Sequence, residues 1–216
     1  MPQGSPNWDQ CAEDYARHRP GPPESYYDLV GRLIGGFSGR TVVDLGTGPG
    51  LVAIQLAERG ARVSGYDISA RQIEQARLQA QGMNAPPLFL AGSAEDLLAD
   101  APELDLAIAN MSWWYFDSKR ILDLLSIKMN PQGSLVISEI KALPDDPANR
   151  IGEAVLSSFG GRRERPDRFT PAPWCGRLSE HHCFVQRAVI GYTEAIPFSA
   201  EGWVGRWLAS KPVLLT

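Results

Sequence analysis

The sequence predicts an α/β fold, doubly wound, with a mainly parallel sheet and helices on both faces. Two observations predict it. Short β-branched apolar runs alternate with stretches of helical periodicity, a pattern typical of βαβ units and a parallel sheet. In addition, the first apolar run ends in a glycine-rich turn, VVDLGTGPG (42–50), that leads straight into a helical stretch.

The elements can be placed in order along the chain. Strands are expected at 41–46, 62–67, 87–92, 104–110 and 134–140, with a sixth over 183–196. Helices are expected before the Pro-rich segment 17–24 and over 51–60, 69–82, 121–129 and 201–210. Ser69 is the expected N-cap of the third of these helices, and NPQG (130–133) is an expected turn.

Composition excludes several classes of protein. At 216 residues and 44% hydrophobic content, one globular domain over 1–216 is expected. The net charge of −4 argues against a broad nucleic-acid surface, and no apolar run approaches the roughly 20 residues of a membrane helix. Three scattered cysteines match no common zinc spacing, so neither a disulfide framework nor a metal is expected. Since the start, MPQGSPNWDQ, also lacks a signal-peptide pattern, we expect a cytoplasmic protein.

The glycine turn is the first candidate for a binding site. A strand, a glycine turn and a helix place backbone N–H groups and a helix N-terminus beside a ligand, at the carboxyl ends of the strands. Gly46, Gly48 and Gly50 permit unusual backbone conformations and remove side chains from the ligand's path. The alternative is a turn that only closes a βα unit. The spacing G-T-G-P-G differs from the G-x-G-x-x-G of dinucleotide enzymes, so a pyrophosphate site is not the natural interpretation.

Two acidic segments follow the next strands. Asp67 ends the second strand, where a carboxylate accepts hydrogen bonds from ribose hydroxyls; alternatively it is a turn residue before the Ser69 cap. GSAED (92–96) follows the third strand, where an adenine ring would lie next. Its alternative interpretation is a helix N-cap at Ser93, and both interpretations can hold together.

Taken in order, VVDLGTGPG, GYDIS, AGSAED, DLAIAN and LLSIKMNPQGSLVISE resemble the class I S-adenosylmethionine-dependent methyltransferases, which have a Rossmann-like fold. NWDQCAEDYARHRPGPPESYYDLV is similar to their small-molecule branch, with a UbiE-like or trans-aconitate-methyltransferase-like core (methyltransferase type 11). The resemblance covers residues 8 to 141. It implies S-adenosylmethionine as cofactor and S-adenosylhomocysteine as product. It also divides the domain into N-terminal lid helices (1–35), a cofactor-binding core (36–141) and a substrate-side and C-terminal part (142–216).

The resemblance further implies roles for individual residues. Asp44 anchors the methionine amino group, through the turn or a water, and Gly46, Thr47, Gly48 and Gly50 approach the methionine and ribose parts. Asp67 takes the ribose hydroxyls and Ile68 packs on the adenine face. Ser93 stands where many members have Asp, so Glu95 or a water is expected to support that contact, and the Ala94 N–H faces the ring. Asn110 and Met111 line the methionine arm, and Tyr15 and Arg19 are lid residues, with Arg19 a partner for the methionine carboxylate.

The acceptor side is less determined. Of the four successive aromatics after the fourth strand, two are expected in the core and two at the site, and the resemblance gives Trp113, Trp114 and Tyr115 as substrate-binding candidates. A general base is needed only for a hydroxyl or a protonated amine, and His181 and His182 are the weak candidates. At the start of a strand, their side chains would point to opposite faces.

The favoured function is methyl transfer to a small molecule by in-line displacement, with O-, N- and C-methylation all open. Methylation of RNA or protein is the second hypothesis, supported only by the basic run 160–168. The third is a protein that binds S-adenosylmethionine without methylating, and a NAD-dependent dehydrogenase is a distant fourth. Relatives usually close the sheet with a seventh strand, which is short or missing here. An edge left open in this way would suit a homodimer, while neither a nucleic acid nor a membrane is an expected partner.

Overall fold

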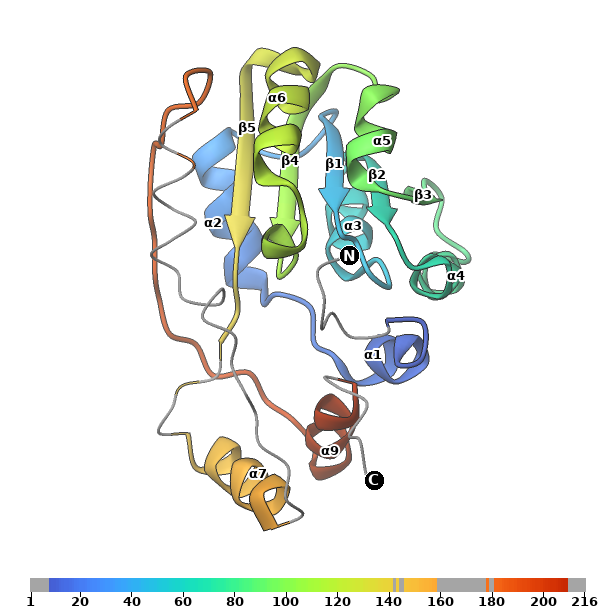
Figure 1. The fold of residues 1–216 in the computed structure, drawn as a ribbon, viewed down its shortest axis with the longest axis vertical. Helices are drawn as coiled ribbons and strands as arrows, with labels where there is room; N and C mark the ends of the chain where they lie inside the picture. The colour runs from blue at the N-terminus through green and yellow to red at the C-terminus, as the bar shows by residue number, and fades with distance from the viewer. Residues whose placement is uncertain (1–7, 142, 144–145, 159–177, 179–180, 210–216) are drawn as a thin grey trace.

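The computed structural model describes residues 8–141, 143, 146–158, 178 and 181–209 (Figure 1). A five-stranded sheet with strand order β3-β2-β1-β4-β5 forms its centre. The strands are β1 (Thr41–Leu45), β2 (Arg62–Asp67), β3 (Leu88–Ala91), β4 (Leu104–Asn110) and β5 (Met129–Ser138). All neighbouring strands pair in parallel, so all five carboxyl ends lie at one edge of the sheet. The expected α/β, doubly wound, parallel architecture is confirmed.

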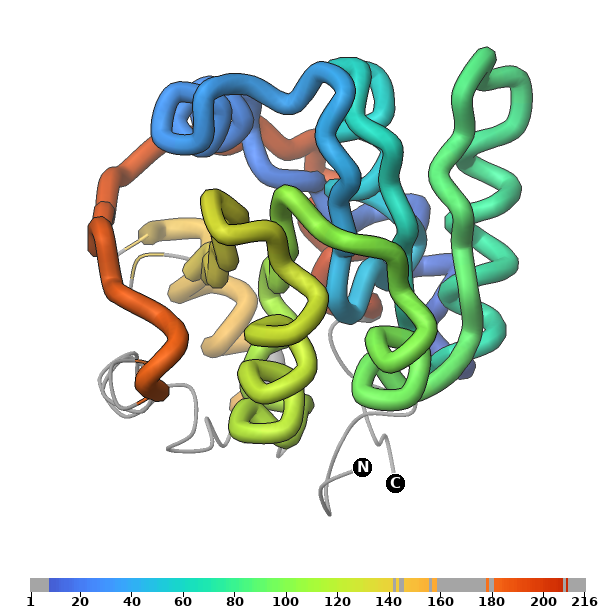
Figure 2. Tube along the Cα trace, turned by 90° about the horizontal axis from the view of Figure 1, so that it is seen from above, coloured from blue at the N-terminus to red at the C-terminus, as the bar shows by residue number. Residues whose placement is uncertain are grey.

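Helices cover both faces of the sheet, as Figure 2 shows from above. On one face α2 (Glu24–Ile34), α3 (Leu51–Glu58) and α4 (Ala70–Gln79) bury their apolar sides in one core cluster with Val42. On the other face α5 (Ala94–Ala99) and α6 (Ser118–Lys128) pack in a second cluster with Val43. Successive residues of β1 thus enter opposite cores, as the alternation of a strand requires. Among the described residues, no helix is long and apolar enough to span a bilayer.

Three helices lie beyond the carboxyl ends of the strands: α1 (Ala12–His18), α7 (Pro147–Ser158) and α9 (Ala200–Leu208), seen below the sheet in Figure 1. Glycines let them approach closely. A Cβ on Gly205 of α9 would lie 2.1 Å from the His18 ring, and one on Gly152 of α7 would lie 2.3 Å from Trp207. The chain therefore builds a helical cap over the edge of the sheet where a ligand is expected.

Two sequence-based expectations are wrong. The segment 183–196 forms no strand; its backbone is extended and unpaired. It is attached to α2 by the Ser25 hydroxyl, which donates to Glu194 and lies 3.3 Å from the Tyr192 hydroxyl. The expected turn at 130–133 instead lies within β5. There Met129 pairs with Leu104 and Ser134 with Leu106, so the four residues between them form an irregular excursion. The seventh strand would fall at the chain end, where residues 210–216 lie outside the described part.

Candidate functional site

The glycine turn connects β1 to α3 and is fastened to β2. The backbone N–H groups of Gly46 and Thr47 both donate to the Tyr66 carbonyl, at 2.8 and 2.9 Å. Gly46 has a φ of +70°, and a Cβ there would lie 2.5 Å from the Ser112 Cβ. Gly46 is therefore required by the close approach of the segment after β4.

Gly50 has a similar structural cause. Its φ is +84°, and a Cβ would lie 2.8 Å from Phe89 of β3 and 3.2 Å from Ala76 of α4. Gly48, with a φ of +54°, differs from both. Of the described atoms, only the Gln72 Oε1 comes within 4 Å of its Cβ position, at 4.0 Å. Gly48 is thus the glycine of the turn that leaves open space over the backbone, which is where a ligand can approach.

Asp67 faces the same turn from the end of β2. Its Oδ2 accepts from the Gly48 N–H at 2.8 Å, and its Oδ1 accepts from the Ser69 N–H at 2.9 Å. Burial raises the pKa of the Asp67 carboxyl, and these two hydrogen bonds oppose the rise. Beside it the Ile68 side chain is 53% exposed. An acceptor and an uncovered apolar surface therefore stand next to Gly48.

Asp44 lies below the turn and is almost fully buried. The Thr47 hydroxyl donates to its Oδ2 at 2.7 Å. Burial raises the pKa of Asp44 to about 7, and the nearby Asp67 charge adds to the rise, while the Thr47 hydrogen bond opposes it. Asp44 and Thr47 thus form a buried pair that holds the turn from beneath.

The segment after β3 is a helix N-cap, as one of the two interpretations predicted. Ser93 caps α5 by accepting from the Asp96 N–H at 3.3 Å, and its hydroxyl donates to Glu95 at 2.9 Å. The second oxygen of Glu95 accepts from the Asp117 N–H at 3.1 Å. Glu95 therefore links the start of α5 to the start of α6, while Ala94 is buried beneath.

The end of β4 carries a hydrogen-bond chain that sequence reasoning missed. The Tyr26 hydroxyl of α2 lies 3.0 Å from the Ser138 hydroxyl of β5, which donates to Asn110 Oδ1 at 2.9 Å. This hydrogen bond uses the Asn110 side-chain oxygen, so the side-chain NH2 group is the part that can donate to a ligand. Met111 follows with a φ of +59°, the one described non-glycine residue in the left-handed region. Such backbone strain gathers at functional sites. No local pattern connects Tyr26 and Ser138, because they are 112 residues apart.

The N-terminal segment reaches this edge through aromatic contacts. Trp8 makes edge-to-face contacts with Tyr15 and with Tyr115, at centroid distances of 5.9 and 5.8 Å. Arg19 lies 5.1 Å over the Tyr15 ring. Ser69 lies two residues after Asp67 in the chain, and its hydroxyl donates to Asp9 at 2.5 Å. Trp8 and Asp9, which the sequence did not single out, therefore hold the N-terminal segment beside the glycine turn.

The aromatic run after β4 divides as expected. Trp113 is buried in the second core cluster and Phe116 packs against it, whereas Trp114 and Tyr115 are partly exposed. The three-residue 3-10 helix Trp113–Tyr115 produces this division. A contact of Trp113, Trp114 or Tyr115 with an acceptor stays a prediction, and the burial of Trp113 favours the other two.

His181 and His182 lie elsewhere. The expectation that they point to opposite faces is wrong, because residues 181–183 begin no strand. Their rings stack instead, at 5.1 Å and 16°. His181 Nε2 lies 3.1 Å from Asp123 in the middle of α6. None of the contacts described for either ring reaches the glycine turn at 46–50 or Asp67.

A shallow hollow elsewhere on the protein does not belong to this site. It lies at the opposite edge of the sheet, where β1 and β4 begin, and is lined by Arg40, Asp105, Asn130, Pro131 and Gln132.

Comparison with known proteins agrees with this geometry. The model of a family described as "Methyltransferase domain" matches residues 42–133. A solved S-adenosylmethionine-dependent methyltransferase from Thiobacillus denitrificans, in complex with S-adenosyl-L-homocysteine, is 24% identical with a TM-score of 0.51, over 72% of this chain and 70% of that one. This likeness identifies the class of fold.

Sequence relatives identify the family. A ubiquinone biosynthesis O-methyltransferase from Chromobacterium violaceum is 30% identical over 81% of this chain and 75% of its own length. A trans-aconitate 2-methyltransferase from Rhodococcus jostii is 27% identical over 92% and 78%. Two further ubiquinone biosynthesis O-methyltransferases, from Alkalilimnicola ehrlichii and Nitrosomonas europaea, match over only 39% and 29% of their own lengths. The chain belongs to the class I S-adenosylmethionine-dependent methyltransferase family.

Proposed function

We propose that this chain transfers the methyl group of S-adenosylmethionine to a small-molecule acceptor. The observation that carries the proposal is the open space over Gly48, beside the Asp67 carboxylate and the exposed Ile68. A Cβ at Gly48 would fill that space, whereas the other two glycines of the turn already face protein atoms. The residues present therefore fit a nucleoside with a charged methionine arm.

Individual residues would hold the cofactor as follows. Asp67 accepts the ribose hydroxyls, Ile68 covers one adenine face, and the Ala94 N–H with Glu95 borders the ring. Asn110 and Met111 line the methionine arm, and Arg19 with Tyr15 closes the lid near its carboxylate. Because Asp44 is buried beneath Thr47, it would act on the amino group through the turn rather than by direct contact.

The chemistry asks little of the protein beyond placement. The bound sulfonium supplies an electrophilic methyl group, so the chain must orient the acceptor in line with it and exclude water. The lid supports both tasks, since Trp8 connects α1 to Tyr115 at the carboxyl end of β4. An acceptor that is ionised near neutral pH, such as a carboxylate or an acidic phenol, needs no general base.

The partly exposed aromatics near the lid favour a flat or apolar acceptor. The Tyr115 ring contacts both Trp8 and Trp114, with ring centroids 5.8 Å apart in each pair. Rigid aromatic walls with few polar groups are the usual lining of small-molecule pockets. Two relatives are named for small molecules, ubiquinone and trans-aconitate, which supports the same class of acceptor here.

Calorimetric titration with S-adenosylmethionine and S-adenosylhomocysteine tests the cofactor site. Gly48→Ala should abolish binding of both ligands, since the added methyl group enters the open space. Gly39→Ala is the matched control: its φ is +73° and nothing lies within 4 Å of its Cβ position, so it carries the same backbone cost without a ligand nearby. Asp67→Ala should also abolish binding, although it removes the hydrogen bond that holds Gly48 as well. Equal binding by Gly48→Ala and Gly39→Ala would remove the proposed site.

Transfer of a tritiated methyl group tests the reaction. The protein is incubated with labelled S-adenosylmethionine and, separately, with phenols, carboxylic acids, RNA and a protein extract. We expect label in a phenol or a carboxylate. Label in RNA or protein would replace the proposed acceptor class with a macromolecule. Tight cofactor binding without transfer to any of them would identify a binding protein.

A further inference from the structure

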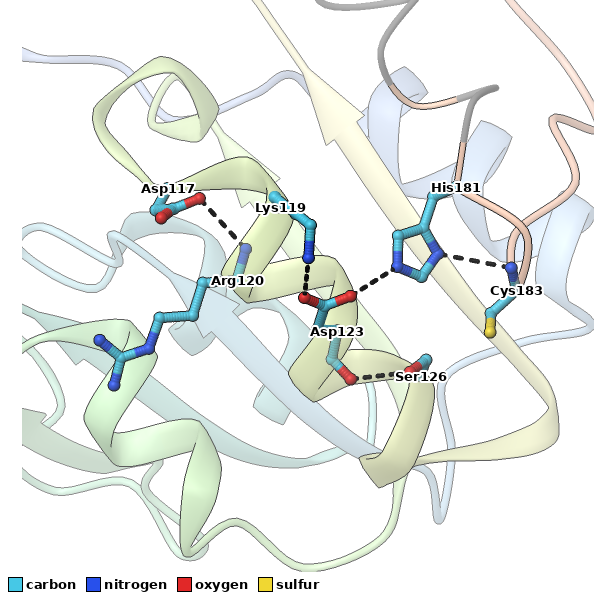
Figure 3. Close-up of polar contacts among 7 residues, drawn as sticks. All are labelled: Asp117, Lys119, Arg120, Asp123, Ser126, His181 and Cys183. Atoms are coloured by element: carbon cyan, nitrogen blue, oxygen red, sulfur yellow. Dashed lines mark hydrogen bonds and ion pairs between the residues drawn. The ribbon is translucent and has the colours of Figure 1, made fainter.

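A group of metal-binding side chains lies away from the proposed methyl-transfer site. His181, His182 and Cys183 lie in one turn of the chain. Figure 3 shows His181 and Cys183 of this turn, with His181 directed towards Asp123 of α6. One ligand atom from each residue lies within 4.8 Å of the other two. The His181 side chain is only 9% exposed, whereas His182 and Cys183 are exposed. One fixed ligand and two adjustable ones therefore face the same small volume.

Asp123 sets the orientation of His181. Its Oδ1 lies 3.1 Å from His181 Nε2, and its Oδ2 is held by Lys119 at 2.7 Å. In the neutral tautomer in which Nε2–H donates to this carboxylate, the lone pair is on Nδ1. That Nδ1 accepts a long hydrogen bond from the Cys183 backbone N–H, at 3.4 Å, which a bound metal would displace. A carboxylate that accepts from one ring nitrogen while the other nitrogen binds the metal is the usual outer-shell arrangement of a metal-bound histidine.

The other two side chains complete a mixed set of donors. The His182 ring stacks on that of His181, so the two imidazoles lie face to face. Cys183 is a free, exposed thiol. Two imidazoles and one thiolate suit Zn²⁺, a borderline-soft ion that favours nitrogen and sulfur ligands. Ligands of tetrahedral Zn²⁺ lie roughly 3.5 Å apart, so closure needs about 1 Å of movement by the two exposed side chains.

We propose that His181, His182 and Cys183 bind a Zn²⁺ ion, that Asp123 positions His181, and that water completes the coordination. Binding replaces the Cys183 S–H bond with a Zn–S bond and releases the proton to solvent. The sequence suggested no metal because its three potential ligands are consecutive and match no spaced zinc signature. The site is independent of the proposed methyl transfer.

Zinc titration of the full chain tests the proposal. The protein is purified without a histidine tag, treated with a chelator under reducing conditions, and titrated with Zn²⁺ in competition with a chromogenic chelator. We expect one Zn²⁺ per chain. Cys183→Ser and His182→Gln should each weaken binding at least tenfold. With Co²⁺ as the probe, a sulfur-to-metal charge-transfer band should appear in the wild type and vanish in Cys183→Ser.

Matched variants separate the ligands from their surroundings. Cys11→Ser removes a buried thiol outside the cluster and should bind Zn²⁺ as the wild type does. Asp123→Ala should weaken binding about 10- to 100-fold and keep the charge-transfer band. Lys119→Ala breaks the ion pair on the same carboxylate and should change little. If the wild type binds no Zn²⁺, or if Cys183→Ser and His182→Gln bind it as tightly as the wild type, the site does not exist. Retained S-adenosylhomocysteine binding by both variants shows that they are folded.

Discussion

At the residue scale, the protein's own packing accounts for two of the three glycines in the turn. Gly50→Ala should therefore destabilise the fold whether or not a ligand is present. The left-handed φ costs an alanine roughly 1–2 kcal/mol, and the overlap with Phe89 adds about 1–3 kcal/mol. Urea denaturation should show a loss of about 2–5 kcal/mol, the sum of these two costs. Gly39→Ala, which meets no neighbour, should show only the backbone cost, and equal losses would refute the packing argument.

Asp44 should make stability depend on pH. Its pKa rises from the ordinary 3.8 to about 7 because the carboxyl is buried, so the folded state keeps a proton that the unfolded chain releases near pH 4. The stabilisation of the folded state by the bound proton on Asp44 is therefore full below about pH 4, and it is lost as the pH rises towards 7. A shift of this size corresponds to about 4 kcal/mol.

The Asp44→Asn variant tests this dependence. The amide cannot ionise, and its oxygen can still accept from Thr47. Denaturation curves from pH 5 to pH 8 should be flatter for Asp44→Asn, with a gain in stability at pH 8. A residual slope is expected from Asp67, whose pKa is also raised by burial. Asp28 is exposed, so Asp28→Asn serves as the control. If stability depended on pH equally in Asp44→Asn and Asp28→Asn, the raised pKa of Asp44 would be contradicted.

The residues that the sequence predicted correctly are those with local causes. Ser69 and Ser93 cap their helices as predicted, each by accepting from an N–H three residues on. Ser112 and Phe89 were not predicted as the neighbours of Gly46 and Gly50, because they come from distant strands. Local chemistry determines a cap, whereas the cause of a tight glycine becomes visible only when the sheet is assembled.

At the scale of helices and strands, the difference between local and long-range causes explains which strands the sequence predicts correctly. All five strands of the sheet were predicted from their apolar runs, since a strand buried on both faces needs such a run. Segment 183–196 has a similar composition but no ladder partner among the described residues, and Val185 there is 86% exposed. Strand propensity expresses a fit to a pleated surface, so it cannot create a strand where no neighbour is available.

The contact between α9 and α1 should depend on Gly205. Alanine at this interior helix position gains about 1 kcal/mol in propensity, but its Cβ would lie 2.1 Å from the base of the His18 ring. The overlap outweighs this gain, because the whole His18 ring would have to leave its rotamer or α1 would have to shift away from α9. Hydrogen exchange of residues 200–208 should become faster in Gly205→Ala. Gly202→Ala on the same helix meets only the Ser199 hydroxyl at 3.2 Å and should leave exchange slow. Equal protection in both would mean that α9 is held by other contacts.

At the scale of the whole molecule, β5 is one of the two edge strands of the described sheet, and β3 is the other. An unpaired edge is a template for a second chain, and Val185 and Val189 add exposed apolar surface. We expect a homodimer, with a mass in solution scattering of about twice 23.6 kDa. Val185→Lys/Val189→Lys should return it to a monomer, and a monomeric wild type would disprove this expectation.

A ligand that binds only the folded chain raises its melting temperature, and this effect reports on the whole molecule. At S-adenosylhomocysteine concentrations 100-fold above Kd, the gain in stability is about 2.7 kcal/mol. For a chain of this length, that corresponds to a shift of roughly 5–10 °C. Gly48→Ala should lose the shift, because its methyl group occupies the ligand's space. Cys183→Ser should keep it, because the proposed zinc ligands lie against α6. A shift lost in both variants would mean that the turn at 181–183 and the cofactor site are coupled, and the two proposals would then have to be joined into one.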